Sequence, residues 1–214
     1  MKKIALYDID NTIISIDSFV LFVFYAINKN KIKFFYLPVF AFLLLLWCVK
    51  IISTKKFKTF CYNRFIADKN TNINELSKDF IIKAVIPKIK QEIPELLRKQ
   101  RSQGYSIILA TASFEFYLKH LADYLKADVF VGTRFKIDNI TKKGQYEGNN
   151  CKGQEKLSRL SEIMNFDEID INNSVSFSDS LTDLPFLDIT GVFHLIHKTE
   201  WKIIKTIQRS LKHP

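Results

Sequence analysis

The pattern of apolar and polar positions divides the chain into three stretches. Residues 3–8 form an apolar run with an acidic residue only at its end, which predicts a buried strand. From residue 15 to about residue 101 the pattern is helical and predicts no strand. After Gly104, short apolar runs alternate with amphipathic segments, which is typical of a parallel α/β sheet. The helical stretch is therefore expected as an insert between the first strand and the rest of the sheet.

The same pattern predicts individual elements. Within the insert we expect helices over residues 18–28, 55–67, 74–85 and 87–103, and a polar, basic connection over residues 29–33. Pro94 should kink the last helix or start a fresh turn in it, and Gly104 should end it. In the sheet region we expect strands over residues 105–110, 127–131, 174–178 and 192–196, a hairpin over 133–148, and helices over 114–125, 154–164, 181–188 and 201–212.

Two carboxylates stand at the end of the first strand. Asp8 and Asp10 are separated by one residue, and alternate residues of a strand point to the same side, so both can face one space. Two carboxylates placed together repel each other unless a cation keeps both ionised. This spacing suits a divalent metal, or a nucleophile beside a general acid. A polar turn or a helix cap is the structural alternative.

Two later strand ends carry residues of the same chemical kind. Thr111 and Ser113 follow the second strand, Asp179 and Asp183 follow the strand at 174–178, and Lys156 lies on the helix before it. Ligands of α/β sheets bind outside the carboxyl ends of the strands, so we expect these groups around one crevice. Carboxylates with few other donors favour Mg²⁺, and the hydroxyl, the helix-start amides and the lysine suit phosphate oxygens. Ser113 is expected to cap the following helix.

The composition is basic and aromatic. The 214 residues carry 32 Lys+Arg against 22 Asp+Glu, a net charge of +10. Such an excess suits nucleic acid, an anionic membrane surface or a phosphorylated substrate. The three scattered cysteines argue against a disulfide framework and a zinc site. No zinc finger or RNA-binding motif is present, so we expect no nucleic-acid partner. Two lysines lead straight into the first strand, so no secretory signal is expected.

Four segments resemble the motifs of the haloacid dehalogenase-like phosphatases. Residues 8–12 (DIDNT) resemble the DxDxT motif, 109–113 (LATAS) the second motif, 153–156 (GQEK) the GxxK third motif, and 178–185 (SDSLTDLP) the fourth. They occur in the family's order and cover essentially the whole chain. The fourth motif is similar to that of the phosphoserine-phosphatase-like branch, within it the subgroup that includes phosphatidylglycerophosphatase C.

The resemblance implies the architecture. It implies an α/β fold in which a Rossmann-like parallel sheet core carries an α-helical cap inserted after the first strand. Residues 1–14 and 102–214 would form the core, and residues 15–101 the cap. The asparagine at position 11 and the serine at position 178 replace common glycines of the superfamily. Neither is expected to impair activity, since asparagine tolerates turn geometry.

The resemblance also implies roles for the site residues. Asp8 would be the nucleophile that forms an aspartyl-phosphate, and Asp10 would act as general acid and then general base. Thr111, Ala112 and Lys156 would bind the substrate phosphate. The metal set would be Asp8, Asp10, Asp179 and Asp183: Asp8, the Asp10 carbonyl and Asp179 would bind Mg²⁺, and Asp183 would orient them or a bound water. Lys152 is a second lysine near the third motif, although Lys156 fits GxxK.

Residues 34–52 are almost unbroken apolar sequence, interrupted by Pro38 and Lys50. The segment is close to the roughly 20 residues that span a bilayer. Burial in the cap is the alternative, but a helix that is apolar on every face needs burial all round. A single crossing is excluded, because Asp8 precedes the segment, Thr111 follows it, and the two must meet. The segment should therefore re-enter the membrane at a Pro38 kink, lie in the interface, or pair with residues 19–27.

Basic residues on both sides of this segment support membrane contact at an anionic, cytoplasmic surface. They are Lys29, Lys31, Lys33, Lys50, Lys55, Lys56 and Lys58. The sequence thus predicts a Mg²⁺-dependent phosphomonoester hydrolase on the cytoplasmic side of the plasma membrane, with a lipid phosphate such as phosphatidylglycerophosphate as substrate. The alternatives are a soluble phosphatase of small, phosphoserine-like molecules and a non-catalytic membrane-associated protein. The oligomeric state stays open.

Overall fold

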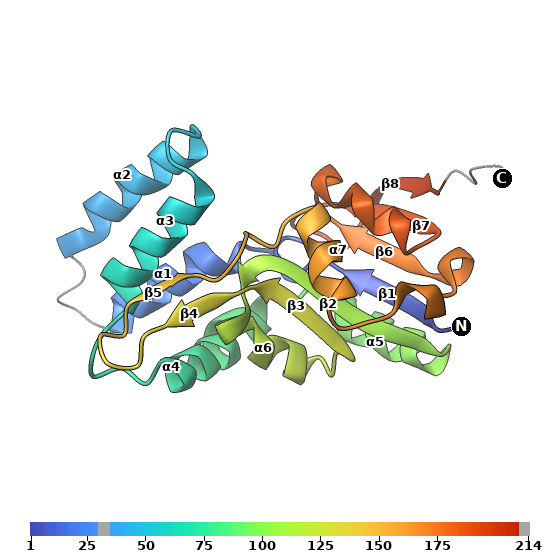
Figure 1. Cartoon of the computed structure of the whole chain (residues 1–214), viewed down its shortest axis with the longest axis horizontal. Coiled ribbons are helices and arrows are strands. Elements are labelled where there is room, and N and C mark those ends of the chain that lie inside the picture. Colours follow the sequence, from blue (N-terminus) through green and yellow to red (C-terminus); the bar gives the residue numbers. More distant parts are fainter. Residues whose placement is uncertain (30–34, 210–214) are drawn as a thin grey trace.

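A six-stranded sheet forms the centre of the computed structural model, which describes residues 1–29 and 35–209. The strand order is β3-β2-β1-β6-β7-β8, and only the β7–β8 pair is antiparallel. The fold is therefore the predicted α/β class with a mainly parallel sheet (Figure 1). The strands are β1 (Lys3–Tyr7), β2 (Tyr105–Phe114), β3 (Val129–Thr133), β6 (Val175–Ser178), β7 (Val192–Ile196) and β8 (Ile203–Gln208).

The last strand corrects a prediction. We expected a helix over residues 201–212, but Ile203–Gln208 forms β8 at the sheet edge, and residues 210–212 lie outside the described part. The run Ile203-Ile204-Lys205-Thr206-Ile207 is rich in β-branched residues, which favour strands. Its backbone pairs with the exposed edge of β7, which a helix would leave unpaired.

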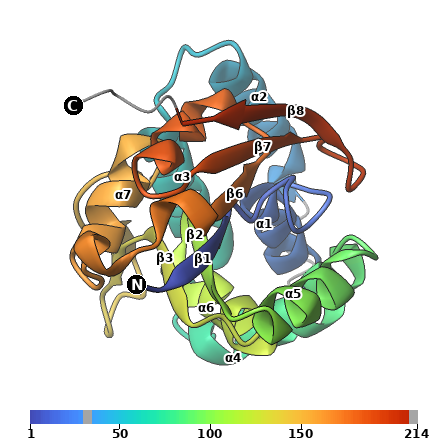
Figure 2. The ribbon, with the colours of Figure 1, turned by 90° about the vertical axis from the view of Figure 1, so that its right-hand side faces the viewer.

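Alternate residues of the strands feed two separate cores. Ala5 and Tyr7 face one core, together with Leu97 of α5 (Ile93–Ser102) and residues of α6 (Glu115–Tyr124). Ile4 and Leu6 face the other, beneath α7 (Gln154–Ser161) and the 3₁₀ helix η7 (Leu181–Asp188). Figure 2 shows α5 and α7 on opposite faces of the sheet. This alternation is what a strand buried on both sides requires.

Within the described residues, every helix or strand between β1 and β2 is a helix, as predicted. Figure 1 shows α2 and α3 as a hairpin at the end of the molecule away from β8. The elements are α1 (Ser18–Lys29), α2 (Leu37–Cys48), α3 (Thr54–Cys61), the π-helix η2 (Tyr62–Ile66), α4 (Ile73–Phe80), the π-helix η3 (Ile81–Val85), the 3₁₀ helix η4 (Ile86–Lys88) and α5.

Several helix boundaries differ from the expected ones. The helices expected over 55–67 and 74–85 each end in a π-helical turn, η2 and η3. The helix expected over 87–103 is two, η4 and α5, and Pro94 lies in the first turn of α5, where its missing N–H costs no hydrogen bond. Gly104 follows α5 with φ 81°, a conformation that glycine adopts readily. The expected connection at 29–33 lies mostly outside the described residues.

The predicted hairpin is present and contacts the helical insert. Its strands are β4 (Phe135–Ile137) and β5 (Gly144–Tyr146). The side chain of Asn63 exchanges two hydrogen bonds with the Gly144 backbone, at 2.9 and 2.7 Å. Two short 3₁₀ turns, η5 (Phe166–Glu168) and η6 (Ile171–Asn173), precede β6. The hairpin thus joins the sheet region to η2 of the insert.

Candidate active site

The carboxyl end of β1 places Asp8 inside the protein. The Asp8 N–H donates to Phe177 O of β6 at 2.9 Å, so the residue continues the sheet, and it is only 7% exposed. The chain then turns, because the N–H groups of Ile13 and Ile14 both donate to Ile9 O. Asn11 adopts φ 59° in this turn, as the sequence predicted for an asparagine that replaces glycine. The turn brings Asp10 to the same cavity as Asp8.

A buried lysine joins two of the predicted carboxylates. Lys156 Nζ donates to Asp8 Oδ1 at 2.6 Å and to Asp183 Oδ2 at 2.7 Å, and the residue is 2% exposed. Asp183 also accepts from Ser178 Oγ at 2.7 Å and from the Gly153 N–H at 3.3 Å. Lys156 and not Lys152 therefore contacts the nucleophile candidate; Lys152 is exposed at the rim of the cavity.

A glycine makes this approach of α7 possible. Gly153 immediately precedes α7 with φ 57°, and a Cβ atom there would lie 2.9 Å from Thr182 O of η7. Only glycine combines this backbone conformation with so close a contact. The GxxK spacing thus fixes the lysine one helical turn after the point where α7 meets η7.

The buried charges shift each other's pKa values. Burial raises the pKa of the Asp8 carboxyl to about 8, against the opposing pull of the Lys156 ammonium. Burial also lowers the pKa of Lys156, but the Asp8 and Asp183 carboxylates outweigh it and hold that pKa above its ordinary value. Burial raises the pKa of Asp179 as well. A bound cation or phosphate would shift these pKa values again. Shifted pKa values of charged groups around a cavity are expected of a functional site.

Asp10 is oriented by hydrogen bonds from two elements. Ser113 Oγ of β2 donates to Asp10 Oδ2 at 2.6 Å, and the Ser18 N–H at the start of α1 donates to Asp10 Oδ1 at 2.8 Å. The expectation that Ser113 caps the next helix is wrong. β2 continues to Phe114, so Ser113 still lies on the strand and its hydroxyl points to Asp10, while α6 has no side-chain cap.

The second motif lies beside these carboxylates. Thr111 Oγ1 accepts from the Ser113 N–H at 3.1 Å and lies 3.4 Å from Asp10 Oδ2. Ala112 lines the cavity, and its carbonyl accepts from Lys58 Nζ at 2.9 Å and from Thr133 Oγ1 at 2.7 Å. The structure therefore brings the residues of all four motifs together at the carboxyl end of the sheet.

The helical insert adds residues that the sequence reasoning missed. The cavity of about 360 Å³ is also lined by Asp17, Trp47, Thr54 and Lys58 of the insert, and by Lys198. Lys58 is buried, which lowers its pKa although Asp17 opposes this. A sequence signal for Lys58 exists: it shares the buried face of α3 with Phe57 and Cys61, where a lysine is unusual.

The donors available to a metal ion are few. In the ranges that the structure describes, no three Asp, Glu, His or Cys side chains form a group that could hold a metal by themselves. The carboxylates of Asp183 and Asp10 are hydrogen-bonded elsewhere. This leaves Asp8 Oδ2, which accepts only a long bond of 3.4 Å from Thr12 Oγ1, together with the Asp179 side chain and the Asp10 carbonyl. Mg²⁺ is typically held by one or two carboxylates, with waters and substrate phosphate completing the shell, so this set fits it.

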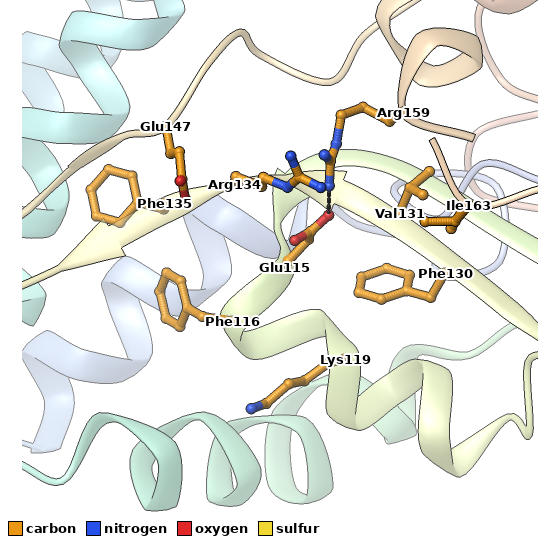
Figure 3. Close-up of a pocket in the computed structure, with 10 residues that line it drawn as sticks. All are labelled: Glu115, Phe116, Lys119, Phe130, Val131, Arg134, Phe135, Glu147, Arg159 and Ile163. Atoms are coloured by element: carbon orange, nitrogen blue, oxygen red, sulfur yellow. Dashed lines mark hydrogen bonds and ion pairs between the residues drawn. The ribbon is translucent and has the colours of Figure 1, made fainter. Parts of the chain in front are cut away.

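A larger cavity, of about 480 Å³, is lined by residues that include Glu115, Arg134 and Arg159 (Figure 3). Three of its charged groups form ion pairs: Arg159 Nη2 donates to Glu115 Oε1 at 2.6 Å, and Arg134 and Arg159 both donate at 2.7 Å to Glu162, which lies outside the lining. None of the predicted site residues lines it. The Arg159–Glu115 pair attaches α7, which carries Lys156, to the start of α6. We assign the cavity no chemistry.

Comparison with known proteins identifies the family. The model of the haloacid dehalogenase-like hydrolases matches residues 5–188, and the chain belongs to this family. This confirms the resemblance drawn from the four motifs. The chain is similar to the protein CicA of Caulobacter vibrioides, with 31% identity over 93 residues, 43% of this chain and 40% of that protein. It is also similar to a probable phosphatase of Mycobacterium tuberculosis, with 26% identity over 134 residues, 61% of this chain and 44% of that protein.

The fold agrees with this assignment. A solved structure of substrate-bound phosphoserine phosphatase superposes with a TM-score of 0.64 at 16% identity, over 90% of this chain and 85% of that chain. This confirms the phosphoserine-phosphatase-like fold within the family. The chain spans less than half the length of the two relatives compared by sequence.

Proposed function

We propose that this protein hydrolyses phosphomonoesters through an aspartyl-phosphate on Asp8. One observation carries the proposal: a carboxylate buried at the carboxyl end of β1 contacts a lysine that is itself held by Asp183. Family membership and the similarity to phosphatases support it. Such a lysine attracts the negative charge of a phosphoryl group and favours the ionised form of the nucleophile.

The chain's own residues supply the steps. An oxygen of Asp8 attacks phosphorus, and the bond between phosphorus and the leaving oxygen breaks. Asp10 passes a proton to that oxygen, and then accepts one from the water that hydrolyses the aspartyl-phosphate. Lys156 balances charge on Asp8 and the phosphoryl oxygens, and Thr111 and Ala112 bind those oxygens. Asp183 keeps Lys156 in place through its hydrogen bond of 2.7 Å.

Mg²⁺ is the proposed cofactor. Asp8, the Asp10 carbonyl and Asp179 would hold it, and Asp183 would act on the site through Lys156 and not as a direct ligand. When bound, the cation neutralises charge on the phosphoryl oxygens and allows Asp8 to stay ionised beside Asp179.

The proposed substrate is a lipid phosphate, because α2 exposes apolar side chains next to the site. Phe40 is the only α2 residue that is fully buried, at 1% exposure, whereas Phe42 and Leu45 are 60% and 58% exposed. No helix in the described ranges is long and apolar enough to span a bilayer. Pro38 lies in the first turn of α2, so it makes no kink. The α1 residues expected as a hairpin partner are largely buried in the core.

Charge supports an anionic lipid surface as the partner of this face. No acidic residue occurs between Asp17 and Asp68. Besides Lys58, which is buried in the active cavity, the basic residues of that stretch are Lys29, Lys31, Lys33, Lys50, Lys55, Lys56 and Arg64. Each lysine near an anionic surface adds about 1 kcal/mol of attraction. We therefore propose that the α2–α3 hairpin lies in the interface on the cytoplasmic side of the plasma membrane.

The hairpin also reaches the site. Trp47 of α2 and Thr54 of α3 line the active cavity, and Trp47 Nε1 donates to Thr54 Oγ1 at 3.1 Å. A phosphorylated headgroup at the membrane surface would thus need to move only across the end of the hairpin to reach Asp8. Phosphatidylglycerophosphate is the specific proposal, by the resemblance of the motifs.

A substrate panel tests the proposal. Purified protein with Mg²⁺ is assayed for phosphate release from phosphatidylglycerophosphate in micelles and from free phosphoserine. We expect faster turnover of the lipid. Faster turnover of phosphoserine would instead favour a soluble small-molecule phosphatase, in agreement with the phosphoserine phosphatase structure that shares the fold.

Vesicle flotation tests the surface. Phe42→Glu with Leu45→Glu should abolish binding to phosphatidylglycerol vesicles and leave hydrolysis of p-nitrophenyl phosphate unchanged. Ile140→Glu is the matched control, because Ile140 is 84% exposed on the β4–β5 turn, outside the hairpin. Equal loss of binding in both proteins would contradict the assignment of α2 as the membrane surface.

A further inference from the structure

A line of buried hydroxyl groups runs from Asp10 into the protein. Ser113 Oγ donates to Asp10 Oδ2 at 2.6 Å and lies 3.2 Å from Ser18 Oγ, which lies 3.0 Å from Tyr117 Oη. All three hydroxyl residues are buried. They come from three elements, β2, α1 and α6. The proposed reaction uses none of them directly, so their arrangement needs another explanation.

The direction of donation along this line follows from Asp10. A carboxylate only accepts, so the Ser113 hydroxyl donates to it. Ser18 donates to Ser113, which leaves the Ser18 oxygen to accept from Tyr117. Burial raises the pKa of the Tyr117 hydroxyl well above its ordinary value, so this group keeps its proton. All three hydrogens therefore point toward Asp10, and hydrogen bonds in such a chain strengthen one another.

The other oxygen of Asp10 is held as well. The Ser18 N–H donates to Asp10 Oδ1 at 2.8 Å. Ser18 is the first residue of α1, where backbone N–H groups have no partner within the helix. Both carboxylate oxygens are thus fixed, and Asp10 remains in the lining of the active cavity. An unbonded aspartate would instead sample several rotamers.

We propose that Ser113, Ser18 and Tyr117 are positioning residues that hold the Asp10 carboxyl group in the orientation needed for proton transfer to the leaving oxygen. The inference rests on the proposed function, since it takes Asp10 as the acid. During phosphorylation of Asp8, the bond from phosphorus to the leaving oxygen breaks while the Asp10 proton passes to that oxygen. A displaced Asp10 slows this transfer without weakening phosphate binding.

The test compares two leaving groups. Nitrophenolate leaves without a proton, whereas an alkoxide needs one. Ser113→Ala should lower kcat/KM for an alkyl phosphate such as glycerol phosphate by about 10- to 100-fold, the loss expected for one hydrogen bond to a charged group. It should change kcat/KM for p-nitrophenyl phosphate by less than about 3-fold. Tyr117→Phe, which keeps the ring, should show the same selectivity at smaller size.

Three controls make the result decisive. Ser176→Ala removes another buried hydroxyl, bonded to Thr190 and to Val192 O, and should leave the ratio of the two activities unchanged. Ser113→Thr keeps the hydroxyl and should restore the alkyl phosphate activity. Equal losses on both substrates, or none, in Ser113→Ala and Tyr117→Phe would overturn the positioning role. If Asp10→Asn lowers both activities equally, Asp10 is not the acid, and the proposed function fails together with the positioning role.

Discussion

Two regions of this molecule reverse the usual placement of side chains. At the carboxyl end of the sheet, charged groups are buried: Asp8, Lys156 and Asp183 are each less than a tenth exposed. In α2, apolar groups such as Phe42 and Leu45 are exposed. Folded domains ordinarily bury apolar side chains and leave charges in water. Each exception therefore calls for its own physical account.

The two regions differ in what offsets the cost of the unusual placement. The buried charges compensate each other within the chain, because one lysine contacts two carboxylates at 2.6 and 2.7 Å. The apolar face of α2 has no such compensation within the described residues, where only Phe40 of this helix is buried. The first region can therefore be preorganised before any ligand binds. The second needs a partner outside the chain, and a bilayer interface is the one we propose.

Asp8→Asn should have the largest effect. It removes the nucleophile and leaves the shape of the site, so phosphate release should fall by at least about 10⁴-fold. The fold should persist, because the amide relieves the cost of burying a charge. Circular dichroism checks the fold, and a phosphate-release assay checks activity. Unchanged phosphate release would mean that Asp8 is not the nucleophile. No phosphate release by either protein would favour a non-catalytic, membrane-associated protein with a relic site.

Lys156→Met tests the internal compensation. The substitution leaves the Asp8 and Asp183 carboxylates buried without their cation, which should lower the free energy of unfolding by about 3–5 kcal/mol. Lys152→Met is the control, since it removes the same charge from an exposed position and should cost less than about 0.5 kcal/mol. Urea denaturation of both variants measures the difference. Similar costs would show that the contacts of Lys156 with Asp8 and Asp183 do not stabilise the fold more than an exposed lysine does.

Phe40→Ala tests how α2 is attached. Phe40 packs against Phe24, Phe57 and Phe65, with ring centroids 5.0, 6.3 and 5.5 Å away. Its loss should lower the free energy of opening α2 by about 3 kcal/mol. Leu45→Ala, at an exposed position of the same helix, should change it by less than about 0.5 kcal/mol. Amide hydrogen exchange of α2 in solution measures both; equal effects would mean that α2 has a second buried face.

Much of the candidate site at the carboxyl end of the sheet could be predicted from the sequence, because its motifs are short and local. The spacing of Asp8 and Asp10, the GxxK motif and the pair Asp179–Asp183 fix side chains relative to one strand end or one helix turn. Contacts between distant segments could not be read in this way. Lys58 reaches the site from α3, and Ser113 points to Asp10 only because β2 runs to Phe114.

The same limit applies outside the site. Residues 203–208 form a strand because an edge of β7 is available to pair with, which no local pattern reveals. The apolar run at 34–52 was long enough to suggest a membrane segment, but α2 covers only 12 residues. Its exposed face and the single buried Phe40 depend on where α3 and α1 lie.

The smallest expected effect concerns pH and metal. In the metal-free protein, burial raises the pKa of Asp8 to about 8 and also raises that of Asp179. A raised carboxyl pKa means that the folded protein holds a proton more tightly than the unfolded chain. This contribution to stability is complete below about pH 4, the ordinary pKa, and it is lost as pH rises toward 8. A cation must displace the same proton, so Mg²⁺ affinity should increase from pH 6 to pH 8.

Thermal unfolding with and without Mg²⁺ at each pH isolates this site from other titrating groups. Mg²⁺ at about ten times its Kd adds about 1.4 kcal/mol, which is about 3–6 °C for a chain of this size. At a fixed Mg²⁺ concentration the increase in Tm should therefore be larger at pH 8 than at pH 6, and Asp8→Asn should remove most of the pH dependence. An equal increase at both pH values would mean that Mg²⁺ binds away from the buried carboxylates. The buried carboxylates at the carboxyl end of the sheet would then serve only to hold Lys156.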